Sequence, residues 1–160
     1  MRCIAFATLM LALLPIVDAR EKPGEKPELK LSKDEQAIVD LTNAERKAAK
    51  LPALTANPQL MAAARSHALN MAKQEKLSHK LDDKEPADRV KDAGYDFGYV
   101  GENIAWNQDT PKEVLADWMK SKPHKENILN AEYTEIGVAV EKNKKGERYW
   151  VQVFGKPLEK

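Results

Sequence analysis

Three short stretches of this chain carry residue types that could act together in chemistry: Ser78-His79, the run GENIAW around Glu102, and the segment that begins at His124. They hold two of the three histidines and one carboxylate that lies in an otherwise apolar run. Burying a carboxylate without a partner is costly. The sequence therefore predicts that Glu102 is paired, and the imidazoles of His79 and His124 are its natural partners.

Two neutral imidazoles and a carboxylate are the kind of three-ligand set that holds zinc with an open position for water. On this hypothesis, His79 and His124 bind Zn²⁺ or another divalent cation, and the bound water hydrolyses peptide or cell-wall material. On the alternative hypothesis, Glu102 accepts hydrogen bonds from one or both histidines and fastens a long loop and a late helix to a sheet without catalysis. The spacing does not decide between them, because no two of these residues share one helix face.

Each histidine also has a serine nearby, which raises the question of a nucleophile. Only Ser121 is spaced to face its histidine, since adjacent side chains such as Ser78 and His79 point apart, and the chain has no Gly-x-Ser-x-Gly turn. We interpret the serines as cap and turn residues, with Ser121 as the N-cap of the helix that carries His124. His67 falls on the apolar stripe of a predicted helix, which indicates a core-edge histidine rather than a ligand.

Residues 1–19 have the organisation of a secretory signal peptide. Arg2 precedes an apolar run of roughly 15 residues, and Val17 and Ala19 are the small residues expected before a cut after Ala19. A membrane-spanning helix needs about 20 apolar residues, and Pro15 and Asp18 shorten this run. We therefore expect a secreted, extracytoplasmic chain with no membrane span once the signal is removed; an uncleaved anchor is the alternative.

The composition of the mature chain excludes several kinds of functional site and disfavours one class of partner. Cys3 is the only cysteine and would leave with the signal, which excludes disulfides, thiolate zinc sites and a thiol nucleophile. The formal net charge of +1 does not favour nucleic acid as a partner. About 140 residues remain after the cut, enough for one domain with its own core. We expect a monomer.

The elements that must position the candidate residues follow a flexible tether. Residues 20–31 are charged and rich in Pro and Gly, so they cannot bury enough surface to order themselves. The domain is predicted over residues 32–157, with capping signals at Ser32, Asn57 and Thr110. Helices are expected at about 33–49, 57–76 and 86–93, and from 110 and 123.

The predicted strands lie mostly late in the chain. One strand, at residues 98–106, carries Glu102, and alternating apolar residues at 136–140 and 149–154 flank a turn. Because helices separate the first strand from this hairpin, the strands must pair at long range. The order predicts an α+β domain with helices packed on an antiparallel sheet.

A series of short motifs, taken in order, resembles the CAP superfamily (SCP domain) of cysteine-rich secretory, antigen and pathogenesis-related proteins, in its bacterial form. They are residues 41–46 (LTNAER), 78–79 (SH), 93–95 (AGY), 101–105 (GENIA), 118 (W), 124–129 (HKENIL), 133–138 (YTEIGV) and 149–155 (YWVQVFG). The resemblance covers nearly everything from about residue 34 to 157. It implies a three-layer α-β-α sandwich, which agrees with the order of the predicted elements.

The resemblance also implies a cleft. Many eukaryotic members line a cleft with two histidines and two glutamates, and His79, Glu102 and His124 match three of those positions. Asn103 and Asn127 lie in the same motifs and are expected to support the cleft. Some relatives bind a divalent metal through the histidine pair, which makes His79 and His124 the candidate metal ligands here.

The second glutamate of that cleft is missing. Ser121 stands where it would lie, and neither Glu113 nor Glu126 has a spacing that replaces it. The missing carboxylate weakens the hydrolase hypothesis but leaves apolar ligand binding untouched.

Three aromatic residues near Glu102, namely Tyr95, Phe97 and Tyr99, are expected to form a lip of the cleft. Family members have been proposed to bind sterols or other lipids, so the lip could contact such a ligand. The sequence therefore favours a non-enzymatic binding module whose partner is an extracellular lipid, protein or cell-envelope component. A metal-dependent hydrolase is the alternative, and no cofactor is required by the first interpretation.

Overall fold

The computed structural model describes residues 29–159. The predicted signal peptide and residues 20–28 of the predicted tether lie outside this range. Within it, the elements are α1 (Lys33–Ala48), β1 (Thr55–Ala56), α2 (Pro58–Gln74), α3 (Pro86–Asp92), β2 (Phe97–Trp106), α4 (Pro111–Lys120), α5 (Lys122–Ile128), β3 (Glu135–Lys142) and β4 (Arg148–Pro157). No helix of this part of the chain is long and apolar enough to cross a membrane.

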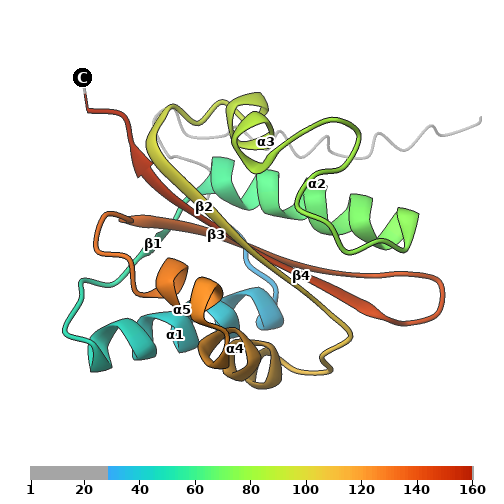
Figure 1. Cartoon of the computed structure of the whole chain (residues 1–160), viewed down its shortest axis with the longest axis horizontal. Coiled ribbons are helices and arrows are strands. Elements are labelled where there is room, and N and C mark those ends of the chain that lie inside the picture. Colours follow the sequence, from blue (N-terminus) through green and yellow to red (C-terminus); the bar gives the residue numbers. More distant parts are fainter. Residues whose placement is uncertain (1–28, 160) are drawn as a thin grey trace, which may run out of the picture.

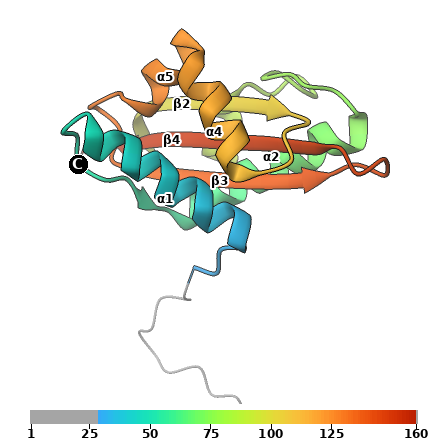
Figure 2. The same ribbon diagram turned by 90° about the horizontal axis from the view of Figure 1, so that it is seen from below.

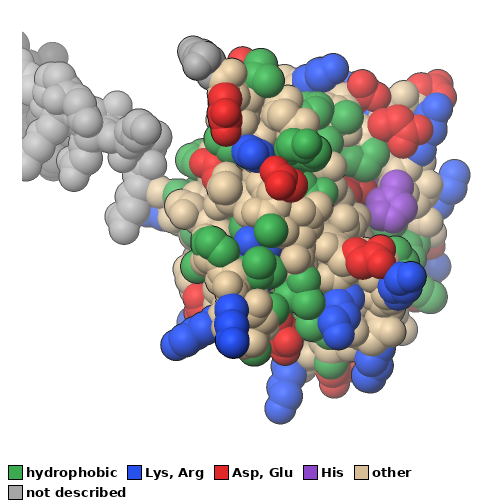
Figure 3. Space-filling model, turned by 60° about the vertical axis from the view of Figure 1, so that its left-hand side comes forward, with side chains coloured by type: hydrophobic (Ala, Val, Ile, Leu, Met, Phe, Trp, Pro, Cys, Tyr) green, Lys and Arg blue, Asp and Glu red, His purple; other side chains and the backbone are tan. Residues whose placement is uncertain are grey.

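A central sheet separates two layers of helices (Figure 1). Helices α2 and α3 cover one face, and α1, α4 and α5 cover the other, where they lie in front of the strands in Figure 2. The predicted three-layer α-β-α sandwich is confirmed. On the face in Figure 3, basic and acidic side chains are interspersed with hydrophobic ones, in keeping with the small net charge.

The strand order in the sheet is β1-β3-β4-β2. The predicted antiparallel pairing is confirmed for β3 with β4 and for β2 with β4. A further short strand, β1, pairs in parallel with β3 through Thr55 and Ala56, and two residues are too few to produce a periodic sequence signal. Strand β2, which carries Glu102, is therefore an edge strand.

Three helix starts were predicted to have a serine or threonine N-cap, and at two of them the side chain makes the capping hydrogen bond. Ser32 forms a capping box with Glu35, and Thr110 forms one with Glu113. The predicted N-cap position of Ser121 at the start of α5 is confirmed, but its side chain makes no capping hydrogen bond. Ser121 is also the C-cap residue of α4, where its backbone N–H donates to the carbonyl oxygens of Asp117 and Trp118.

Alternate residues of β4 fill the two cores. Trp150 and Phe154 face the cluster beneath α1 and α4, whereas Val151 and Val153 face the cluster beneath α2. This period of two is the expected result for a strand buried on both faces. Strand β4 therefore joins both helical layers to one sheet.

Buried Arg46 of α1 holds the end of α5 in place. Its guanidinium donates to the carbonyl oxygens of Ile128, Asn130 and Tyr133 at 2.9, 2.7 and 3.1 Å, and its Nε donates to that of Pro52. A helix end leaves carbonyl groups without intrahelical partners, and Arg46 satisfies that of Ile128 together with carbonyl groups of the segment that follows α5. Arg46 thereby fixes the helix that carries His124.

Contacts with the domain begin slightly before the predicted start at residue 32. Leu29 and Leu31 pack against the core cluster, and the carbonyl oxygen of Lys30 accepts a hydrogen bond from Arg65 at 2.9 Å.

Candidate functional site

Glu102 lies in the edge strand β2 with its side chain almost fully buried, at 1% exposure. Its Oε2 accepts a hydrogen bond from Arg89 Nη2 at 2.7 Å, and its Oε1 lies 2.8 Å from His79 Nδ1. The prediction that Glu102 is paired is therefore correct. Its partners are the imidazole of His79, one of the two predicted, and the guanidinium of Arg89, which was not predicted.

Arg89 is the functional residue that sequence reasoning missed. It lies in α3, its side chain is 8% exposed, and it also donates through Nη1 to the carbonyl oxygen of Lys84 at 2.8 Å. A buried ion pair is stable only when hydrogen bonds satisfy both charges. The signal that could have revealed Arg89 was therefore chemical: a carboxylate expected to be buried needs a cation, and neutral imidazoles do not supply one.

His67 completes the buried cluster from α2. It is fully buried, and its Nε2 lies 3.7 Å from Glu102 Oε1, which is too long for a hydrogen bond. Neither ring nitrogen has a hydrogen-bond partner among the described residues. Burial lowers the pKa of His67 to about 4, against a smaller upward effect of the Glu102 charge. His67 is therefore a neutral core histidine that adjoins the site.

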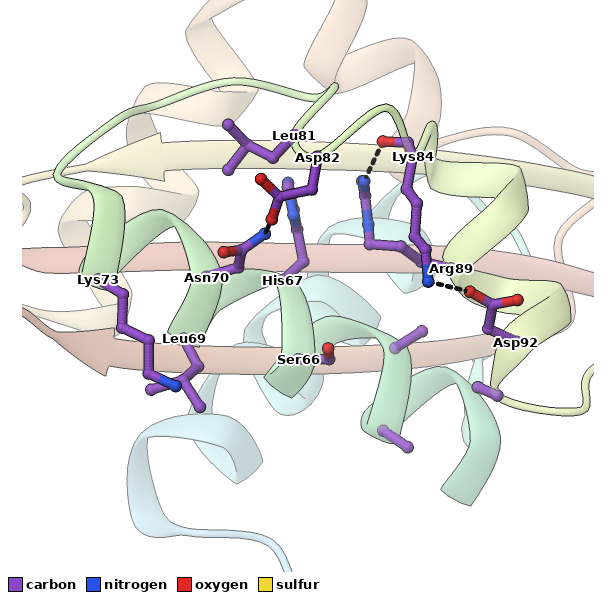
Figure 4. Close-up of a pocket in the computed structure, with 13 residues that line it drawn as sticks. Ser66, His67, Leu69, Asn70, Lys73, Leu81, Asp82, Lys84, Arg89 and Asp92 are labelled. Carbon is purple, nitrogen blue, oxygen red and sulfur yellow. Dashed lines mark hydrogen bonds and ion pairs between the residues drawn. The ribbon is translucent and has the colours of Figure 1, made fainter.

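A hollow of about 520 Å³ lies on the outer side of this cluster (Figure 4). Helix α2, the segment 81–84 and α3 bound it, and its lining includes His67 and Arg89. A Lys84–Asp92 ion pair at 2.7 Å lies at its edge. Glu102, His79 and His124 are not among the lining residues, so this hollow is not the predicted cleft.

His79 presents one ring nitrogen to solvent. Its side chain is 49% exposed, and Nδ1 is bonded to Glu102. Because Glu102 is ion-paired with Arg89 and can only accept, Nδ1 donates this hydrogen bond, and in the neutral tautomer the lone pair therefore lies on Nε2. Ser78, beside it, donates to the carbonyl oxygen of Lys80 at 2.8 Å, which fits its interpretation as a turn residue.

His124 approaches the cluster from the other helical layer, on α5. It is partly buried, and both this burial and the nearby His79 lower the pKa of its imidazole. Its carbonyl oxygen accepts a hydrogen bond from Asn103 Nδ2 at 3.1 Å. Asn127 Nδ2 donates to the carbonyl oxygen of Glu102 at 3.2 Å and to Asn103 Oδ1 at 2.9 Å. The two asparagines thus tie α5 to β2.

Gly101 permits this close approach. A Cβ atom at this position would collide with the Tyr133 hydroxyl and press against Asn127 Oδ1. The glycine that precedes Glu102 is therefore required by packing against the segment that holds α5.

The three aromatic residues predicted to form a lip occupy different environments. Tyr95 is buried and donates its hydroxyl to Glu135 Oε2 at 2.5 Å, so it belongs to the core. Phe97 is partly buried with Lys91 over its ring, and Tyr99 is 52% exposed. Only Phe97 and Tyr99 remain candidates for contact with a ligand.

Neither nearby glutamate replaces the missing carboxylate of the site. Glu113 accepts the backbone N–H groups of Asp109 and Thr110 at the start of α4, and exposed Glu126 lies 3.9 Å from Lys122. Within residues 29–159, no group of three or more His, Cys, Asp or Glu side chains is arranged to hold a metal ion. Both Glu102 oxygens are engaged by Arg89 and His79.

Comparison with known proteins places these features in a family. The model of the cysteine-rich secretory protein family, CAP, matches residues 39–154. The uncharacterized protein YkwD of Bacillus subtilis is 39% identical over 105 residues, which are 65% of this chain and 41% of that protein. The uncharacterized membrane protein YlbC of the same species is 32% identical over 122 residues, 75% of this chain and 34% of that protein. The chain thus spans well under half of either relative.

Two solved structures share the fold. An extracellular protein with an SCP domain from Bacillus anthracis superposes with a TM-score of 0.72 at 30% identity, over 77% of this chain and 40% of that one. An outer surface protein of Borrelia burgdorferi gives a TM-score of 0.76 at 22% identity, over 81% of this chain and 97% of that one. Both neighbours are extracellular or outer-surface proteins.

Proposed function

Because the chain belongs to the CAP family of cysteine-rich secretory proteins, we propose that it acts outside the cytoplasm as a binding module whose imidazoles, His79 and His124, hold a divalent cation such as Zn²⁺. One observation carries this proposal: Nδ1 of His79 is bonded to Glu102 on a half-exposed side chain, so that in the neutral tautomer Nε2 is the nitrogen with a free lone pair. Histidines that bind metals usually donate their other N–H to a carboxylate or carbonyl, which fixes the tautomer and orients the ring.

The position of the second imidazole supports the same proposal. His124 lies close enough to His79 for the charge of one to lower the pKa of the other. Arg46, Asn103 and Asn127 fix the helix that carries it. Two fixed imidazoles leave coordination positions for water or for a donor group of a partner, such as an extracellular protein or a cell-envelope component.

Binding is better supported than hydrolysis. With both imidazoles used as metal ligands, a hydrolase would need another general base to take a proton from the attacking water, but Glu102 accepts from Arg89 and His79 and is buried. The Arg89 cation beside it also disfavours the approach of a second cation to the carboxylate. The site therefore offers ligands without a free general base. Export is supported by the predicted signal peptide and by the extracellular neighbours.

Zinc titration by calorimetry on residues 20–160, without a tag, tests the proposal. We expect one site per chain that is lost in both His79→Ala and His124→Ala. His67→Gln is the matched control, since it removes the third histidine, which is buried, and should retain zinc binding. Circular dichroism would verify that each variant is folded. Absence of heat, or heat that both alanine variants retain, would refute a metal site at these histidines.

A further inference from the structure

A second hollow lies at the end of β2, beside α4. Its volume is about 470 Å³, within the range of about 300–1,000 Å³ that is usual for small-ligand sites. It is lined by Trp106, Asn107, Gln108, Glu113, Ala116, Asp117 and Lys120. None of these residues belongs to the cluster of His79, Glu102 and His124, so its function is independent of the proposed metal site.

Trp106 gives this hollow an exposed aromatic surface. Its side chain is 43% exposed, whereas Trp118 and Trp150 are each 1% exposed. The ring of Tyr149 lies 6.5 Å from that of Trp106 at 41°, so one side of the indole is supported by the protein. Large aromatic side chains contribute strongly to binding when a ligand covers their apolar surface and removes it from water. Trp106 offers such a surface.

Amide and carboxylate side chains, whose polar groups are planar, line the hollow together with the indole of Trp106. Gln108 Nε2 donates to Asp117 Oδ2 at 3.2 Å, but Gln108 Oε1 is buried without a donor in the described part of the chain. Buried acceptors are normally satisfied, so an unpaired one indicates that a donor is missing. A ligand hydroxyl would supply it once the Gln108 amide turns toward the hollow, because Oε1 is not exposed to solvent in this structure.

The segment that carries these groups is rigid. The carbonyl oxygen of Gln108 accepts from Trp150 Nε1 at 2.9 Å, and Asn107 N donates to the carbonyl oxygen of Arg148 at 2.8 Å. Asn107 has φ +74°, in the left-handed region that asparagine tolerates better than most residues. The backbone that carries Asn107 and Gln108 is thus held in place before any ligand arrives, which reduces the entropic cost of binding.

The charges at the hollow select against anions. Glu113 and Asp117 are acidic, and Lys120 lies 3.3 Å from Asp117 Oδ1. The lining thus holds two carboxylates and one lysine, which gives the hollow a net negative charge. An apolar ligand is also disfavoured, because Trp106 and Ala116 are the only apolar side chains in this lining.

We propose that this hollow binds a neutral pyranose saccharide. A pyranose has a face of C–H groups that can stack on an indole and a rim of hydroxyls that both donate and accept hydrogen bonds. The exposed face of Trp106 suits the first, and the amide and carboxylate groups of Gln108, Glu113 and Asp117 suit the second.

Ligand-observed saturation-transfer NMR with three neutral trisaccharides, namely chitotriose, cellotriose and maltotriose, tests the proposal. Acrylamide quenching of fluorescence provides a second measurement, since Trp106 is far more exposed than the other two tryptophans. We expect at least one trisaccharide to bind at millimolar concentration and to protect Trp106 from the quencher. Trp106→Ala should weaken NMR-detected binding by about tenfold or more.

Controls decide how these results are interpreted. Gln108→Leu, which removes the unpaired acceptor, should also weaken binding. Leu69→Ala truncates a similarly exposed apolar side chain in the other helical layer, at 41%, and should retain it. Binding by none of the three sugars, or binding that Trp106→Ala leaves unchanged, would overturn the proposal. Equal binding of the anionic trigalacturonate would overturn its restriction to neutral sugars.

Discussion

Two neighbouring residues of β2, Glu102 and Asn103, organise opposite helical layers by different chemistry. Glu102 faces α2 and α3, where its partners are the cation Arg89 and the imidazole of His79. Asn103 faces the other layer, where neutral groups surround it: it donates to Gln152 Oε1 at 3.1 Å and accepts from Asn127. Adjacent strand residues point to opposite faces, so one step along the chain separates an ionic network from an amide network.

Because of this difference, the edge strand β2 is joined to each of its two helical layers by a different kind of contact. The ionic network draws the segment with His79 toward β2 from one layer, and the amide network draws α5 with His124 toward it from the other. The two histidines are consequently held on the two helical layers beside the same edge strand, close enough for His79 to lower the pKa of His124. A buried charge raises the cost of losing a partner, whereas a neutral amide network tolerates such a loss better.

The largest expected effect comes from removing the cation of the ionic network. Arg89→Leu leaves the buried Glu102 carboxylate without its charge partner, so the free energy of unfolding should fall by about 3–5 kcal/mol. Urea denaturation measures this change. The double variant Arg89→Leu with Glu102→Leu should recover part of the loss, because no uncompensated charge remains.

Glu102→Gln probes the same network from the other side. It leaves the Arg89 cation buried with a neutral partner, and we expect the melting temperature without metal to fall by several degrees. If the metal-free Glu102→Gln protein melts at the wild-type temperature, the ionic network does not stabilise the domain and the contrast with Asn103 fails.

A pH effect of intermediate size should arise from His67, which faces Glu102, Arg89 and His79. Its pKa is about 4 in the folded protein, against about 6.5 in an unfolded chain. The unfolded state therefore binds more protons in this window, so stability is fully present above about 6.5 and falls as the pH drops toward 4. At pH 5 the loss from His67 should be roughly 2 kcal/mol.

Urea denaturation of the wild type and His67→Gln at pH 7 and pH 5 measures this contribution. Carboxylates that titrate in both proteins cancel in the comparison, so the variant should lose less stability between the two pH values. The same pH dependence in both proteins would show that His67 does not stay neutral in the ionic network.

The smallest expected effect lies in the amide network. Gln152 Nε2 donates to Thr42 Oγ1 at 2.7 Å, and both side chains are fully buried. Thr42→Val keeps the shape but removes the acceptor, which should cost about 1–2 kcal/mol in thermal or urea unfolding. Thr134→Val, at an exposed threonine, serves as the control and should change stability by less than about 0.5 kcal/mol. A loss at Thr42 as large as that at Arg89 would erase the distinction between the networks.

Much of the fold was predictable because its signals are local. The capping boxes at Ser32 and Thr110 marked helix starts that the structure confirms, and alternation predicted the β3–β4 hairpin. The two-residue strand β1 was not predictable, since pairing of that length depends only on the position of β3. For Ser121, the residue type was suitable for a cap, but the junction of α4 with α5 leaves its side chain without a capping bond.

The candidate site also combines features that the sequence determines with features that only the tertiary structure shows. The sequence by itself determined that Glu102 is buried and needs a partner, because a carboxylate in an apolar strand cannot remain unpaired. It also determined the family, through motifs that the CAP match over residues 39–154 bears out. Only the tertiary structure decided that the partner is Arg89, that His67 adjoins it and that Tyr95 is in the core. Periodicity assigns a residue to a face of its own element, but the neighbour it meets depends on how α2 and α3 pack across β2.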